Sequence, residues 1–159
     1  MRKIIYVLAI IVLFGFVISG CSSEKGSVNA NAVAASSAEQ STVNVDKLEV
    51  YHFHGNSQCS SCIAVGNLAE ETVNTYFAEE LKSGKIVFGH INAQLPENVA
   101  LANKYQVTGS SLWLGVYGKD GNFYKEENVN VWYKINNKAD YMNYLKGIIE
   151  KRLAGDLSQ

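Results

Sequence analysis

The chain has 159 residues, a formal net charge of −1, and lysines and arginines that are scattered rather than clustered. This pattern lacks the basic patch of nucleic-acid-binding proteins, so we expect no nucleic acid as a partner. The length is sufficient for one domain with a hydrophobic core after the N-terminal segment is set aside. Three cysteines are an odd number, which would leave one thiol unpaired in an exported protein.

The N-terminal segment offers an explanation for the third cysteine. Residues 1–3 include two basic side chains, residues 4–17 are almost all apolar, and Gly20 directly precedes Cys21. This arrangement resembles the signal peptide and lipobox of prokaryotic lipoproteins. The resemblance implies that residues 1–20 are removed, that Cys21 is lipidated, and that the protein is extracytoplasmic and membrane-anchored. The alternative is an uncleaved transmembrane anchor, for which the apolar run is short.

The segment after Cys21 differs in composition from the rest of the chain. Residues 22–46 are rich in Ser, Ala, Asn and Val and show neither a helical nor a strand period. We therefore predict that residues 21–46 form the lipidated cysteine and a flexible tether, spanning about 25–30 Å as a random coil. The tether is either a plain spacer or a linker long enough for the domain to reach a membrane partner.

The centre of the chain is a cysteine pair between a predicted strand and a predicted helix. Residues 50–53 are rich in β-forming side chains, and residues 55–57 favour a turn. After Cys62, apolar residues recur at three- and four-residue steps as far as Leu81, which indicates an amphipathic helix. Cys59 thus lies at a helix N-terminus, where the helix dipole and free amide groups favour the thiolate that attacks disulfides.

The remaining elements complete an α/β domain. We expect strands at 86–91, at 111–117 and around 123–125, and helices that begin near Pro96 and cover 139–153; residues 129–135 fit either an edge strand or an irregular loop. The order β-α-β-α-β-β-α predicts a mixed four-stranded sheet with helices on both faces.

On these residues, the segment 47–155 resembles a thioredoxin-like domain with Cys59-Ser60-Ser61-Cys62 as its redox motif. Within that superfamily, the sequence at 51–56, Tyr-His-Phe-His-Gly-Asn, is most similar to the nitrophenyl compound nitroreductase subunit ArsF family. The resemblance implies a βαβαββα fold and thiol–disulfide exchange with a protein partner, for which a membrane permease or an electron-transfer protein are candidates.

The sequence departs from the thioredoxin-like pattern in two places. The usual cis-proline, which helps to bind an extended substrate, is replaced by Ser110-Ser111. A cis bond without proline costs several kcal/mol, so we expect a trans bond there and a dedicated partner. The resemblance places Ser110, Ser111 and His54 at the substrate groove. The position of the usual buried acid beneath the second cysteine falls on His52.

Each candidate site residue has a predicted role. Cys59 is the expected nucleophile, and Cys62 is the expected resolving thiol of a Cys59–Cys62 disulfide. His52 either accepts the proton of Cys62 or is a core histidine bonded to the backbone. His54 is expected to influence the thiol pKa, and His90 to be structural.

We predict a membrane-anchored thiol–disulfide oxidoreductase that needs no cofactor and acts as a monomer. One alternative is a binding module in which the two cysteines and a histidine hold a soft metal or arsenic(III), because C-x-x-C is also a metal-ligand spacing. Another is an adaptor in which the disulfide only staples the turn, although so short a loop stabilises little.

Overall fold

The computed structural model describes residues 42–158 of the chain. The predicted signal peptide, Cys21 and all but the end of the predicted tether lie outside these residues. Within the described part, no helix is long and apolar enough to cross a membrane.

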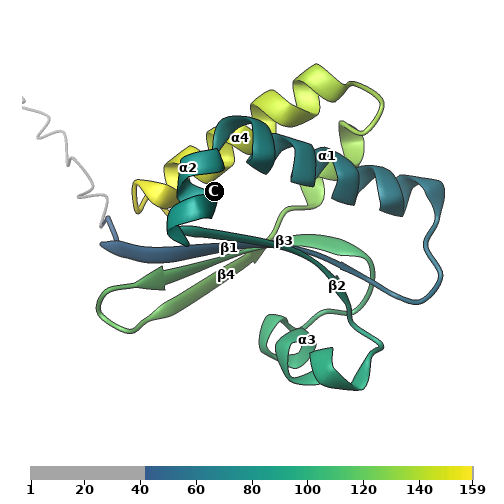
Figure 1. Cartoon of the computed structure of the whole chain (residues 1–159), viewed down its shortest axis with the longest axis horizontal. Helices are drawn as coiled ribbons and strands as arrows, with labels where there is room; N and C mark the ends of the chain where they lie inside the picture. The colour runs from purple at the N-terminus through teal and green to yellow at the C-terminus, as the bar shows by residue number, and fades with distance from the viewer. Residues whose placement is uncertain (1–41, 159) are drawn as a thin grey trace, which may run out of the picture. The chain divides into compact units, whose positions relative to one another are not determined.

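A mixed four-stranded sheet forms the centre of the domain (Figure 1). Its strands are β1 (Val45–His54), β2 (Ile86–Asn92), β3 (Ser111–Gly118) and β4 (Phe123–Glu127), in the spatial order β2-β1-β3-β4. β1 pairs in parallel with β2 and antiparallel with β3, and β3 pairs antiparallel with β4. The long central β1 therefore has a neighbour on each side and leads directly to the cysteine pair.

Helices cover both faces of this sheet. The helical elements are α1 (Ser60–Tyr76), α2 (Ala78–Ser83), η1 (Pro96–Asn98), α3 (Val99–Tyr105), η2 (Val129–Tyr133) and α4 (Lys138–Leu153), where η denotes a 3-10 helix. Figure 1 shows α1, α2 and α4 on one face and α3 on the other. A mixed four-stranded sheet with helices on both faces confirms the predicted thioredoxin-like fold class.

Successive side chains of β1 alternate between the two faces of the sheet, and each face has its own hydrophobic cluster. Leu48 and Val50 are fully buried in the cluster that includes the apolar sides of α1 and α4. Tyr51 and Phe53 belong to the second cluster, with Tyr105 of α3. Because successive side chains of a strand point to opposite faces, one strand supplies both cores.

Several predicted boundaries differ from the structure. The helix expected to continue to Leu81 ends at Tyr76, and α2 follows after Phe77, whose backbone is not helical (φ −133°). Val99, the apolar residue at which α3 begins, is 46% exposed. The ambiguous segment 129–135 contains a 3-10 helix rather than a strand. β1 begins at Val45, inside the segment expected to be tether.

Candidate redox site

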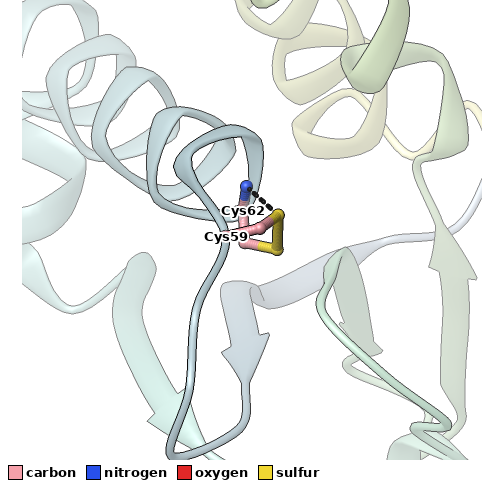
Figure 2. The surroundings of a disulfide bond; sticks show 2 residues. All are labelled: Cys59 and Cys62. Carbon is pink, nitrogen blue, oxygen red and sulfur yellow. Dashed lines mark hydrogen bonds between the residues drawn. A yellow bond between two sulfur atoms is a disulfide. The ribbon is translucent and has the colours of Figure 1, made fainter.

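The cysteine pair lies where the turn after β1 meets the N-terminus of α1 (Figure 2). Cys59 is the N-cap residue of α1, with an extended backbone (φ −77°, ψ 162°) that ends the turn. The amide of Cys62 donates a hydrogen bond of 3.1 Å to Sγ of Cys59. This amide is one of the unpaired donors of the first helical turn, so the Cys59 sulfur occupies the position of a helix cap.

Cys59 and Cys62 are joined by a disulfide, with 5.0 Å between their Cα atoms. Cys59 is exposed, whereas Cys62 is half-buried. No acidic residue lies in the first turn of α1. After reduction, the helix dipole and the Cys62 amide would stabilise a thiolate at Cys59, which is the sulfur that a partner can reach.

His52 lies beneath this turn and is 1% exposed. Its Nδ1 is 3.0 Å from Nδ1 of His90, which lies opposite it in the parallel register of β1 and β2. The ring of His52 also stacks on that of His54, with 5.5 Å between ring centroids. Within the described residues, Nε2 of His52 is buried and has no hydrogen-bond partner.

Gly66 of α1 allows His52 to pack against the helix. A Cβ placed on Gly66 would lie 2.3 Å from Nδ1 of His52, which is closer than real atoms approach. Gly66 is one helical turn after Cys62, so the close approach places the imidazole next to the first turn of α1. In the sequence, the only signal for this role of Gly66 is a glycine inside a helical pattern, which often marks a close packing contact.

The surroundings of His52 keep its imidazole neutral. Burial lowers the pKa of His52 to about 4, and His90 and His54 act in the same direction, while the Cys62 backbone opposes them. The Cys62 backbone therefore lies close to the His52 ring. A neutral imidazole with an unpartnered nitrogen is a proton acceptor by its chemistry.

A cavity of about 210 Å³ opens beside this histidine. Its lining residues are His52, His54, Gln58, Ile63, Asn67 and His90. Gln58 and Ile63 flank the cysteine pair in sequence, so the cavity connects the histidines with the turn that carries the disulfide.

The residues expected at the substrate groove differ in whether their polar atoms are free to bind a ligand. Ser111 is buried, and its hydroxyl donates to the Gly109 carbonyl and accepts from the Trp113 indole. Ser110 is half-buried, and within the described residues its Oγ has no partner. His54 is half-buried, with Nδ1 2.9 Å from the Gly55 carbonyl oxygen. Ser110 and His54 therefore retain polar atoms for a ligand, and the Ser111 hydroxyl is already engaged.

His90, which we expected from the sequence to be structural, contacts a polar side chain on each of two other elements. It bridges His52 and Glu70 of α1, with 3.3 Å between Nε2 and Oε2 of Glu70. The sequence contained no signal for this contact, because it depends on the register between β1 and β2.

The described residues include no group of three or more His, Cys, Asp or Glu side chains arranged to hold a metal ion. The metal-binding alternative requires such a third ligand beside the two cysteines. No observation on this part of the chain therefore favours it.

No family model and no curated protein matches the chain. Ten chains of solved structures resemble it, and three of them serve as examples. They are the Trx4 domain of ERdj5 (16% identity, TM-score 0.43, 70% of this chain and 87% of that chain covered), the zinc-bound form of human ERp44 (18%, 0.43, 63% and 27%) and a thioredoxin from Thermus thermophilus (16%, 0.41, 67% and 76%). The chain thus spans about a quarter of the ERp44 chain. The fold assignment rests on the sheet order and helix placement described above.

Proposed function

We propose that the protein is an extracytoplasmic thiol–disulfide oxidoreductase that exchanges electrons with a protein partner through Cys59 and Cys62. The observation that carries this proposal is the disulfide at an exposed helix N-terminus, with Sγ of Cys59 accepting the Cys62 amide. This geometry stabilises the thiolate that must leave or attack in each exchange.

In the reductive direction, the Cys59 thiolate attacks a partner disulfide and forms a mixed disulfide, releasing one partner sulfur as a thiolate. Cys62 then attacks Sγ of Cys59, the bond to the partner breaks, and the second partner sulfur leaves. The partner gains two electrons and the Cys59–Cys62 pair loses them. The oxidative direction is the reverse sequence.

The test compares the two single cysteine variants of the full chain, purified in detergent. Cys62→Ser should retain attack and accumulate a mixed disulfide with a model disulfide substrate, whereas Cys59→Ser should form none, because only the exposed sulfur is reachable. The wild-type pair should have a reduction potential between about −120 and −300 mV against glutathione. Full exchange activity in Cys59→Ser would contradict the proposal.

We propose in addition that lipidation of Cys21 anchors the domain to a membrane, on the basis of the lipoprotein-like N-terminus. The tether predicted at residues 21–46 would then link the lipid to the domain and set how far the domain can reach towards a membrane partner. Metabolic labelling with a radioactive fatty acid should mark the wild-type chain and not Cys21→Ser. Equal labelling of both would contradict the anchor.

A further inference from the structure

Three side chains from three elements form a hydrogen-bonded line that begins beneath the cysteine pair. His52 of β1 contacts His90 of β2 through their Nδ1 atoms at 3.0 Å, and Nε2 of His90 faces Oε2 of Glu70 of α1 at 3.3 Å. The line begins at a fully buried ring and ends at a carboxylate whose side chain is 49% exposed. It therefore connects the buried side of the redox site with solvent.

The end of the line determines where the protons lie. A carboxylate can only accept, so Nε2 of His90 must donate to Glu70. In a neutral imidazole the other nitrogen then has a free lone pair, so Nδ1 of His90 accepts from Nδ1–H of His52. His52 is thereby held as the tautomer in which Nε2 is unprotonated. This is the same Nε2 that is buried without a partner within the described residues.

The titratable groups around His52 are His54 on its own strand, His90 on β2 and Cys62 on α1, with Glu70 beyond His90. Burial and both neighbouring imidazoles disfavour a positive charge on His52 itself. His90 is better placed to hold that charge, because its side chain is 34% exposed and faces a carboxylate. A proton taken up at Nε2 can therefore be balanced by release of the Nδ1 proton to His90, with His52 neutral before and after.

We propose that His90 and Glu70 are positioning residues for proton transfer at the disulfide: they hold His52 ready to accept the Cys62 proton and pass a proton on toward solvent. The inference rests on the exchange function proposed above. In the resolving step, the Cys62 thiol proton moves to Nε2 of His52, and the freed electron pair forms the bond to Sγ of Cys59. The bond from Cys59 to the partner breaks, and the partner sulfur leaves with that electron pair. The Nδ1 proton of His52 moves to His90, which becomes an imidazolium paired with Glu70.

The experiment measures the resolving step separately from the first attack. Reduced full-length protein is mixed with Ellman's reagent in a stopped-flow instrument: the first thionitrobenzoate is released by Cys59 and the second by Cys62. His90→Asn keeps an acceptor near the Nδ1 position but cannot pass a proton on. It should slow the second release about tenfold at pH 7 and move its pH profile to higher pH, with the first release unchanged.

Glu70→Gln and Glu71→Gln are a matched pair of charge-neutralising variants on α1. Glu70→Gln should slow the second release about threefold, because the tautomer of His90 is no longer held by a carboxylate. Glu71 forms an exposed ion pair with Lys138, and within the part of the chain that the structure describes it contacts no histidine, so Glu71→Gln should match the wild type. Nitrogen-15 NMR of the oxidised wild type should show His52 protonated at Nδ1 and His90 at Nε2.

An unchanged second release and pH profile in His90→Asn, with wild-type thermal stability, would overturn the relay and leave the exchange function intact. So would a His52 ring protonated at Nε2 in the oxidised wild type. A wild-type chain that gives no second release would overturn the exchange function and the relay together.

Discussion

Two buried polar residues of β1, Glu49 and His52, lie on opposite faces of the sheet and differ in how completely they are paired. Glu49 is 5% exposed, and its carboxylate accepts from Lys47, Tyr105 and Tyr117 at 2.7–2.9 Å. His52 is more deeply buried; its Nδ1 contacts His90, and its Nε2 is unpartnered within the described residues.

The electrostatic consequences are opposite. Burial by itself raises the pKa of Glu49, but the hydrogen bonds from its three partners outweigh burial, and the net effect lowers the pKa. At His52, burial dominates and lowers the pKa to about 4. Glu49 is thus held in its charged form and His52 in its neutral form. A fully paired buried group stabilises the fold, and a partly paired one costs stability but keeps an atom available for chemistry.

The largest loss of folding stability should come from removing the paired carboxylate of Glu49. Glu49→Ala should lower the free energy of unfolding by about 4 kcal/mol at pH 7, because three donors lose their acceptor and Tyr105 is fully buried. Chemical denaturation measures this loss. Glu127→Ala, at an exposed position on β4, should change stability by less than about 0.5 kcal/mol. Equal effects of the two variants would show that the cluster around Glu49 does not stabilise the domain.

The pH dependence of stability should distinguish the two residues. His52 has a pKa of about 4 when folded, compared with about 6.5 in an unfolded chain. As pH falls from about 6.5 to 4, the unfolded state binds the proton and the folded state does not. Stability is therefore lost across this window, by about 3 kcal/mol, and is constant above it with respect to this group.

His52→Phe should remove this loss, as measured by denaturation at pH 7.5 and pH 4.5. Glu49 contributes in a lower window, because its stabilisation is present above its unfolded pKa of about 4.3 and is lost as pH falls through its lower folded pKa. The same loss between these two pH values in His52→Phe and in the wild type would contradict the assignment to His52.

The smallest loss of folding stability should come from a substitution in α1, the helix that covers His52. Gly66→Ala should lower stability by about 2 kcal/mol, because its Cβ would overlap a buried ring that cannot move away freely. Gly147→Ala is the matched control, since Gly147 is also inside a helix and nothing lies within 4 Å of the added atom. That variant should be neutral or stabilising by up to about 1 kcal/mol. A neutral Gly66→Ala would show that His52 is not confined by α1.

The sequence by itself determined the strand–turn–helix arrangement around Cys59 and Cys62, because turn residues, cysteine spacing and apolar periodicity are local signals. It also placed His52 and His54 on one face of β1, since alternation along a strand is a property of the backbone. The fold class followed from the order of such local elements.

Only the tertiary structure brought His52, His90 and Glu70 together. His52 and His90 are 38 residues apart, and they meet because the parallel register of β1 and β2 places them side by side. Glu70 and His90 are 20 residues apart, and they meet because α1 lies over that part of the sheet. The need for a glycine at position 66 has the same origin. Register and helix placement depend on packing of the whole core, so no local pattern predicts which polar groups will face one another.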